Sequence, residues 1–345
     1  MSLKDCIKCG PASPSTTRFI PGLHIIGKVH AFGASVNSST LRLGDRVAAL
    51  LPDGGGNAKY ISIPLSNAIL LPDDARHEDI ICLVANYMTA YQCLKLAKKN
   101  GARLNRAKVL VTNASRPVGQ AIVELALKEG AKVYVTAHKM HEDHLTKLGA
   151  KCFNVKPNKW LPYLEGKMDV VVDNLYTDGY EASYRALKPT GILVCNTNVA
   201  LNNGSPSFCN AFDDTTISTS ISSWWNTVRV KYLWSRAVFY DLNESYQAEP
   251  ETFANELHRL IHKLERGDIK PKVAGRVSLN QVPKAQLLIE KGLPSEFHAM
   301  IVQCLFLSVS SAHISISLLS HVVARRWNSH MPSLEGVGPE SKSES

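Results

Sequence analysis

The sequence has little of what marks a secreted or disulfide-rich protein. Its 345 residues include only eight cysteines, at positions 6, 9, 82, 93, 152, 195, 209 and 304. A chain of this size does not need disulfides to fold, so we expect reduced thiols. The first fifteen residues lack both the apolar core of a signal peptide and an Arg-rich amphipathic pattern. We therefore expect a protein of the cytoplasm or of an organellar matrix, and not a secreted one.

Metal-ligand clusters and blocks of like charge are also scarce. Cys6 and Cys9 form one CxxC with no second pair at metal spacing, and two ligands cannot complete a tetrahedral zinc site. Two incidental thiols are the simpler interpretation, so we expect no metal. The 39 basic and 30 acidic residues are spread along the chain, for a net charge of +9. This distribution favours an anionic small ligand over a dedicated nucleic-acid surface.

The sequence does contain ample apolar material, 45% of its residues, and a change of hydrophobic period along the chain. Between residues 22 and 63, short alternating segments separated by glycine turns predict a small β-rich unit. Helical spacing begins near Asp79 and ends in Lys98 and Lys99, before Gly101. Basic residues followed by glycine are typical of a helix C-terminus.

The middle of the chain alternates between buried-type strands and amphipathic helices. KVLVTN (108–113), PVGQAIVELALKEGA (117–131) and KVYVTA (132–137) form one strand–helix–strand unit. The pattern then repeats as far as GILVCNT (191–197). Such alternation predicts an α/β fold with a doubly wound parallel sheet of Rossmann type. After the aromatic segment WWNTVRVKYLWSRAVFY, the sequence predicts a long helix (250–267) and a last strand, HAMIVQ (298–303).

The first strand-to-helix turn is the candidate phosphate site. In a βαβ unit this turn directs helix N-terminal amides at a pyrophosphate. Gly119 stands where close helix-to-strand packing needs a glycine, Pro117 suits the first helical turn, and Arg116 could contact phosphate with its charged fork. The alternative is an ordinary turn without a ligand.

Basic residues follow the second strand of this unit. An NAD site usually has an acidic residue there for the ribose hydroxyls, whereas this chain has His138, Lys139 and His141, with Lys151 and Lys156 around the next strand. Such a cluster would attract a 2′-phosphate and favours NADPH. The alternative is a solvated helix start with ordinary surface charge.

Read in order, several blocks of the chain resemble the quinone oxidoreductase and enoyl reductase branch of the medium-chain dehydrogenase/reductase superfamily. They cover residues 4 to 302 and comprise DCIKCG, PGLHIIGKV, LRLGDRV, GGGNAKY, MTAYQCL, VTNASRPVGQAIVELA, LTKLGA, DVVVDN and ALKPTGILV. The ordered set is far more specific than any single block.

This resemblance implies a domain organisation and an activity. It implies a partial GroES-like catalytic domain (1–92), a dinucleotide-binding Rossmann domain (93–240), a return to the catalytic domain (241–303) and an atypical tail (304–345). The active site would lie in the cleft between the domains. The implied reaction is hydride transfer from NADPH to a quinone or an activated carbon–carbon double bond of a small-molecule substrate. The resemblance also implies a homodimer.

The chain departs from the family pattern at several positions. Zinc-dependent relatives have a histidine ligand where this chain has Leu23, and His24 falls one position later. The four-cysteine lobe that binds structural zinc in those relatives is also missing. The sequence therefore predicts zinc independence. In the family pattern, opening strands of about thirty residues would precede Asp5, and they are not found in this sequence. At the phosphate turn, Arg116 and Pro117 replace the paired glycines of the family. The tyrosine that donates a proton in enoyl reductases is not found after Gly10, so no catalytic residue is named.

The predicted site residues fall into two sets. The cofactor set is Thr89, Asn113, Ala114, Ser115, Arg116, Pro117, Val118, Gly119, Thr136, His138, Lys139, His141, Lys156, Asp173, Asn174 and Thr197. The substrate set is Asn86, Trp224, Trp225 and Tyr232. The tryptophans are equally well interpreted as core or domain-interface residues.

Two further alternatives concern the tail and the function. Residues 299–324 contain no Asp, Glu, Lys or Arg, so their length would permit a membrane-spanning tail anchor. Six serines and two histidines in that stretch argue against it and favour an irregular extension. The rival to an oxidoreductase is a non-catalytic relative that acts as a nucleotide-binding, single-stranded RNA-binding or interaction protein.

Overall fold

A parallel sheet of six strands forms the centre of the protein. The computed structural model describes residues 20–34, 40–73, 75, 79–154, 156–175, 178–196, 234–290, 299–303 and 314–318. The sheet has the strand order β10-β9-β8-β5-β6-β7, and every neighbouring pair is parallel. Its strands are β5 (Lys108–Val111), β6 (Lys132–Ala137), β7 (Lys151–Asn154), β8 (Met168–Asp173), β9 (Leu187–Cys195) and β10 (Ala237–Phe239). The predicted doubly wound α/β fold is confirmed.

The helices of this unit connect consecutive strands. They are α4 (Pro117–Lys128), the 3-10 turn η3 (Lys139–His141), α5 (Glu142–Lys147), α6 (Pro157–Leu164) and α7 (Glu181–Arg185). The central strands β5 and β8 are buried on both faces, which explains their continuous run of apolar, mostly β-branched residues. The chain runs outward from β5 to β7 and then resumes at β8 on the other side, so the topology reverses between β5 and β8.

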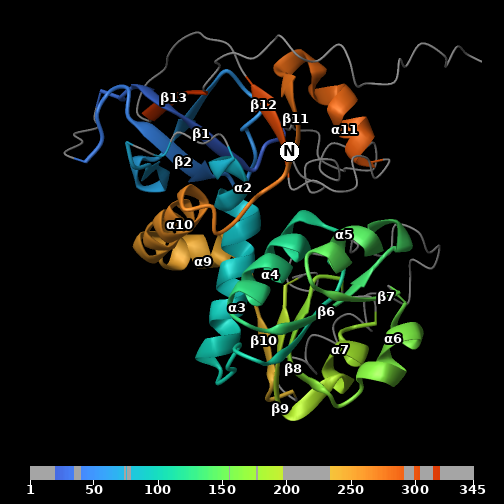
Figure 1. Ribbon diagram of the computed structural model, residues 1–345. Helices are drawn as coiled ribbons and strands as arrows, with labels where there is room; N and C mark the ends of the chain where they lie inside the picture. Colours follow the sequence, from blue (N-terminus) through green and yellow to red (C-terminus); the bar gives the residue numbers. More distant parts are fainter. Residues whose placement is uncertain are drawn as a thin grey trace, which may run out of the picture.

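A second sheet, of five strands, forms the β-rich unit seen above the parallel sheet in Figure 1. Its order is β3-β13-β1-β2-β4, with antiparallel pairing throughout. The strands are β1 (His24–Ala31), β2 (Arg46–Leu50), β3 (Tyr60–Ile63), β4 (Ile69–Leu70) and β13 (Ile314–Leu318), with the 3-10 turn η1 (Leu65–Asn67) before β4. Strand β13 lies between β1 and β3, where Gly27 pairs with Leu318. Residues 314–318, which the sequence analysis placed in an atypical tail (304–345), thus pair with two strands of the β-rich unit.

A long helical segment runs between the two units (Figure 1). It consists of α2 (Ile80–Cys82), a π-helical turn η2 (Leu83–Tyr87) and α3 (Met88–Lys99). The predicted end is confirmed, since Asn100 caps α3 and Gly101 follows with a φ of +99°. This segment, Ile80–Lys99, is long and apolar enough to cross a membrane, but 67% of that window is buried inside the fold. The burial is that of a core helix.

The remaining elements come after the parallel sheet in the chain. They are α9 (Leu242–Ala248), α10 (Pro250–Glu265), the parallel pair β11 (Val273–Ser278) and β12 (Ala299–Gln303), the 3-10 turn η6 (Leu279–Gln281) and α11 (Val282–Glu290). The described residues of the uncharged stretch 299–324 thus form two strands, β12 and β13.

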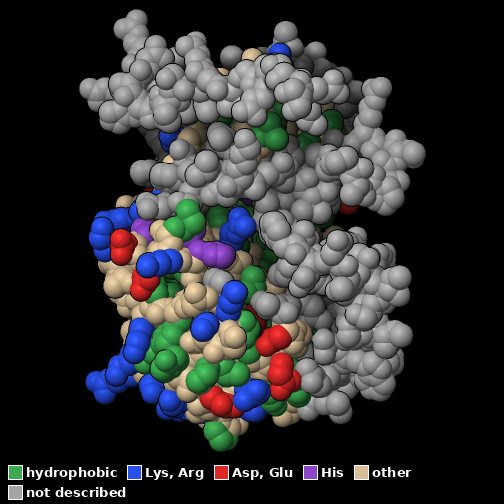
Figure 2. Space-filling model, turned by 90° about the vertical axis from the view of Figure 1, so that its right-hand side faces the viewer, with side chains coloured by type: hydrophobic (Ala, Val, Ile, Leu, Met, Phe, Trp, Pro, Cys, Tyr) green, Lys and Arg blue, Asp and Glu red, His purple; other side chains and the backbone are tan. Residues whose placement is uncertain are grey.

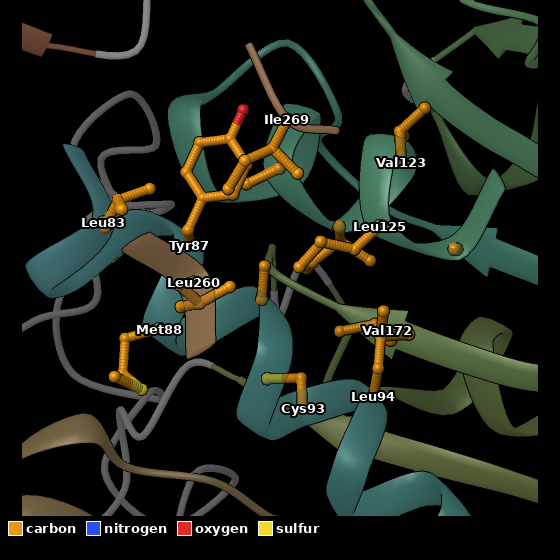
Figure 3. Close-up of a cluster of buried hydrophobic side chains, with 14 of the residues drawn as sticks. Leu83, Tyr87, Met88, Cys93, Leu94, Val123, Leu125, Val172, Leu260 and Ile269 are labelled. Carbon is orange, nitrogen blue, oxygen red and sulfur yellow. The ribbon is translucent and has the colours of Figure 1, made fainter. Parts of the chain in front are cut away.

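One hydrophobic cluster joins the two units. It includes residues of β2, of the π-helical turn and α3, of α4, of the parallel strands and of α10. Figure 3 shows Leu83, Tyr87, Cys93, Val172 and Leu260 converging in this cluster. The predicted boundary at residues 92 and 93 falls inside α3, so the first turns of the helix and its last turns belong to one packed core.

Candidate nucleotide site at the carboxyl end of the parallel sheet

The predicted cofactor residues gather at one edge of the parallel sheet, where the strands end. Thr112 and Asn113 follow β5, His138 follows β6, Asn174 follows β8 and Tyr240 follows β10. In open α/β sheets a ligand binds outside the carboxyl ends of the strands, at the point where the topology reverses. That point is the end of β5, which is the predicted phosphate turn.

The phosphate turn is fixed to the neighbouring strand β6. Asn113 adopts a left-handed conformation with a φ of +52°, and its N–H donates to the Thr136 hydroxyl oxygen at 3.1 Å. The N–H of Ala114 donates to the Thr136 carbonyl oxygen at 3.0 Å. Thr136 is fully buried. Thr136 therefore holds the turn in place through these two hydrogen bonds. Its contribution to the predicted cofactor site is indirect.

Helix α4 begins directly at the turn, with Pro117 in its first turn as predicted. A Cβ added at Gly119 would lie 2.7 Å from both the Asn113 carbonyl oxygen and the Ala114 Cα. Only glycine permits this approach, which brings the helix N-terminus against the end of β5. The amides of a first helical turn have no partner within the helix and carry a partial positive charge.

The side chains around this N-terminus suit an anionic group. Arg116 is exposed at the N-cap, and desolvation by the surrounding chain lowers the pKa of its guanidinium without neutralising it at physiological pH. Gln120 is buried and donates to the Ser115 carbonyl oxygen at 3.0 Å. Ser115 and Val118 are half-buried between these residues. The residues present therefore fit a pyrophosphate.

The basic residues after β6 are brought together only in part. His138 and Lys139 are exposed, and Lys156 is exposed at the start of α6. His141, by contrast, is only 8% exposed and faces inward at the start of α5. Figure 2 shows histidine and basic side chains gathered on the upper part of the described surface of this domain. The cluster open to a ligand is thus smaller than the sequence predicts.

Asp173 and Asn174 support the ends of the strands. The buried Asp173 carboxylate accepts from the Thr112 hydroxyl at 2.9 Å, from the Leu175 N–H at 2.7 Å and from the Ser183 hydroxyl at 2.5 Å. Asn174 bonds to Thr112 through both its backbone N–H, at 2.9 Å, and its side-chain amide, at 3.1 Å. Because its carboxylate already accepts three hydrogen bonds from the protein, we assign Asp173 a role in stabilising the site and not in direct binding of a cofactor.

A small pocket lies beside this support, lined by Thr112, Thr136, Trp160, Asp173 and Ser183 among others. It holds about 230 Å³ of empty space, counting its open mouth. Most of this space is open to solvent, and the enclosed part is far smaller than a small-molecule site, so we assign no ligand to it.

Thr89 reaches the same edge of the sheet from α3. It is 6% exposed, and its side chain hydrogen-bonds with the hydroxyl of Tyr240 at the end of β10. The Tyr240 hydroxyl donates to Gln92 Oε1 at 2.7 Å, and Gln92 Nε2 donates to Glu256 Oε2 at 2.7 Å. Lys95 donates to Glu256 Oε1 at 2.5 Å, and this hydrogen bond raises the pKa of Lys95. These partners are not evident from the sequence, because they come from α3, from the end of β10 and from α10.

Other predicted residues are not brought to the site by the described structure. Asn86 is half-buried within the π-helical turn. Thr197, Trp224, Trp225 and Tyr232 lie outside the described residues. The described residues include no group of three or more His, Cys, Asp or Glu side chains that could hold a metal ion. Leu23, at the predicted ligand position, is half-buried just before β1.

Comparison with known proteins agrees with this geometry. Residues 148–293 match the family model for a zinc-binding dehydrogenase. The chain is 35% identical over 123 residues to the quinone oxidoreductase-like protein 2 homolog of Nematostella vectensis, a match that covers 35% of this chain and 32% of that protein. Several fungal and bacterial polyketide synthases also match, and the chain spans less than a tenth of their length.

Solved structures share the whole fold. The human synaptic vesicle membrane protein VAT-1 homolog-like protein superposes with a TM-score of 0.63 at 20% identity, covering 89% of this chain and 87% of that one. A mycobacterial protein complexed with NADPH superposes with a TM-score of 0.64 at 19% identity, covering 84% and 85%. At these identities the likeness establishes the two-unit architecture.

Proposed function

We propose that the chain is an NADPH-dependent oxidoreductase of the medium-chain dehydrogenase/reductase superfamily, because residues 148–293 match a zinc-binding dehydrogenase model and a quinone oxidoreductase-like protein is among its relatives. The proposed reaction moves a hydride from the reduced nicotinamide to a quinone or to an activated carbon–carbon double bond. For an enone, the hydride adds to the β-carbon, the pair of electrons moves to the carbonyl oxygen, and a proton from solvent completes the product. We further propose that the reaction is independent of zinc.

The observation that carries this proposal is the phosphate turn. The left-handed Asn113, the bonds to Thr136 and the close approach at Gly119 place the N-terminus of α4 at the switch point of the sheet. That arrangement favours the pyrophosphate of a dinucleotide. A bound NADPH supplies the hydride, while the chain supplies binding, orientation and a dry site.

The preference for the phosphorylated cofactor rests on charge at the end of β6. His138 and Lys139 are exposed there, where NAD-selective sites usually carry an acidic residue. A 2′-phosphate gains a charge-assisted contact with a lysine, whereas a ribose hydroxyl does not. We expect NADPH to bind at least about tenfold more tightly than NADH, which corresponds to about 1.4 kcal/mol.

The experiment is calorimetric titration of the full chain with NADPH and NADH. Lys139→Glu should reduce the preference for NADPH, because it replaces attraction to the 2′-phosphate with repulsion. Lys128→Glu is the matched control, since it makes the same charge change at the far, exposed end of α4. Equal affinities of the unmodified protein for the two cofactors would contradict the NADPH proposal, and failure to bind either would contradict the oxidoreductase.

A further inference from the structure

A basic and aromatic surface lies at the outer edge of the parallel sheet, on strand β7 and helix α6 (Figure 1). From Lys151 to Lys167 the chain has four lysines and only one acidic residue, Glu165. Glu165 pairs with Arg185 at 2.7 Å, so its charge is already compensated. Charge is spread evenly along the sequence as a whole, but the fold leaves a local excess of positive charge at this edge.

Helix α6 turns two different faces to its surroundings. Trp160 and Leu164, four residues apart, are buried in a hydrophobic cluster with residues of the parallel strands. Lys159 and Tyr163 are also four residues apart, so they share a second face of the helix. Both are exposed, Tyr163 to 65% of its surface. The ring of Tyr163 therefore buries little apolar surface within the folded chain.

Contacts connect this second face to the edge strand. The Phe153 ring of β7 lies 6.2 Å from the Tyr163 ring, and Lys151 Nζ lies 5.7 Å from the centre of the Phe153 ring. The Lys167 ammonium donates to the Tyr163 carbonyl oxygen at 2.8 Å. Together with Lys159, these neighbours form what we call the α6 surface. Figure 2 views the protein from this side, where hydrophobic side chains lie next to basic ones in the lower domain.

The composition of the α6 surface suits an anionic membrane. Lysines close to a membrane are attracted to anionic headgroups. Tyrosine is favoured at the boundary between headgroups and hydrocarbon, because its ring is apolar and its hydroxyl is polar. We infer that the α6 surface docks the protein on an anionic lipid surface, with Tyr163 as the side chain that enters the interface. This inference is independent of the proposed reaction.

A single-stranded nucleic acid is the other polyanion that basic and aromatic residues bind, and the geometry favours it less. Such sites offer a row of aromatic faces on which successive bases stack. Phe153 and Tyr134, whose rings lie 6.4 Å apart, are half-buried and packed against the cluster that contains Trp160. Of the three neighbouring rings, Tyr163 alone is mostly exposed. One exposed ring among lysines provides an interfacial anchor but not a row of stacking positions.

The test is the partition of the full chain between buffer and lipid vesicles, measured by flotation. One set of vesicles contains equal parts of phosphatidylcholine and phosphatidylserine, and the other contains phosphatidylcholine alone. We expect the protein to float with the anionic vesicles only, and its partition to fall as salt is added, because salt screens exposed charges. An unmodified protein that stays in the buffer with both kinds of vesicle would overturn the inference.

Variants locate the effect on the α6 surface. Each lysine close to an anionic membrane changes the partition about fivefold, so the double variant Lys159→Gln with Lys167→Gln should lower it about 25-fold. Tyr163→Ala should lower it about fivefold through the loss of apolar surface. The matched control is Lys59→Gln with Lys99→Gln, which makes the same change of net charge at exposed positions in the β-rich unit and at the end of α3.

The outcomes separate a docking surface from other origins of binding. Loss of partition in the α6-surface variants, with the control unchanged, supports the inference. Equal losses in the lysine variant and in the control would assign the attraction to net charge and overturn it. Binding of a fluorescent oligouridine in place of the vesicles, abolished by the lysine variant, would also overturn it and assign the surface to nucleic acid.

Discussion

Arg116, at the start of the candidate phosphate site, offers the sharpest residue-scale prediction. It is exposed at the N-cap of α4, beside the turn that would receive the pyrophosphate. A charge-assisted contact with phosphate contributes about 1.5–3 kcal/mol. We expect Arg116→Ala to weaken NADPH binding roughly ten- to a hundredfold without loss of stability, because an exposed turn residue has little packing to lose.

Calorimetric titration measures this effect. Arg103→Ala is the control, because Arg103 is exposed and precedes β5, at the amino end of the strands and away from the phosphate turn. Replacing both Arg116 and Pro117 with glycine addresses the opposite view, that the turn has lost its binding role. A clear gain in NADPH affinity for the Gly-Gly variant would show that Arg116 and Pro117 obstruct the site, and would favour the non-catalytic alternative.

Asp169 gives a residue-scale prediction about pH. Its carboxylate accepts from the Lys108 N–H at 2.8 Å and from the Lys188 ammonium at 2.5 Å. Partial burial alone would raise its pKa, but the bonds to Lys188 and Lys108 outweigh burial and lower it. A lowered pKa means that Asp169 contributes stability above the ordinary pKa of an aspartate, about 3.9, and that this contribution is lost as the pH falls through the lower folded value.

We therefore expect Asp169→Asn to reduce the free energy of unfolding by about 1–2 kcal/mol at pH 7. The difference from the unmodified protein should shrink below about pH 4. Urea unfolding at pH 7 and pH 3.5 measures both values. Glu165→Gln, which removes half of an ion pair with Arg185 whose members are each 50% exposed, should change stability little. A pH-independent difference for Asp169→Asn would contradict the assigned role of its charge.

At the scale of elements, the contact between the π-helical turn η2 and α4 holds the two units together. Tyr87, the last residue of η2, is fully buried and donates to Glu124 Oε2 at 2.5 Å. The other Glu124 oxygen accepts from the Lys270 N–H at 3.0 Å. One carboxylate thus connects η2, α4 and the segment that leads to β11. Burial, followed by the neighbouring charge of Glu124, raises the pKa of Tyr87, which keeps its hydroxyl a donor.

Tyr87→Phe should lower the free energy of unfolding by about 1–2 kcal/mol, because it removes one donor from a partly buried carboxylate. Tyr163→Phe is the matched control, since Tyr163 is 65% exposed, and it should be close to neutral. Urea unfolding provides the measurement. Equal stabilities of the two variants would show that the bond to Glu124 contributes nothing.

The elements that could be predicted from the sequence are those whose signal is local. The strands β5, β6 and β8 read as buried runs, Pro117 and Gly101 mark helix ends, and the phosphate turn follows from its place in the βαβ unit. Helices α6 and α9 were not assigned, because α6 has Pro162 inside it and α9 is only seven residues long. The three-residue strand β10 is too short to stand out in an aromatic segment.

The site shows the same limit. The residues of the turn were predicted because they are contiguous, whereas the Thr89, Tyr240, Gln92 and Glu256 chain joins residues up to 167 positions apart that pattern alone does not connect. The inward position of His141 was missed for a related reason. It is buried at the junction of η3 and α5, and the spacing of basic residues does not show which of them faces inward there.

At the scale of the whole molecule, the β-rich unit depends on the end of the described chain. Strand β13 pairs with β1 through four residue pairs and with β3 through four more. Removing residues 304–345 should therefore separate β3 from β1 and reduce the free energy of unfolding by about 3 kcal/mol or more, at 0.5–1.5 kcal/mol for each lost hydrogen bond. A chain that ends at Ser320 retains β13 and is the control.

Urea unfolding and amide hydrogen exchange of β1 measure this effect. Faster exchange of the β1 amides in the shorter chain alone is the expected result. If the two truncated chains have the same stability as the full one, β13 is not a required part of the sheet.

The place of β13 also has a consequence for how the protein is made. Gly27 cannot pair with Leu318 until the chain has been synthesised beyond β13. At roughly 5–20 residues per second, the delay between their synthesis is about 15–60 s. During that time the edges of β1 and β3 that later pair with β13 stay open, and open strand edges promote aggregation. The nascent β-rich unit therefore benefits from chaperone protection until β13 has been synthesised, whereas the parallel sheet needs only the chain up to Phe239.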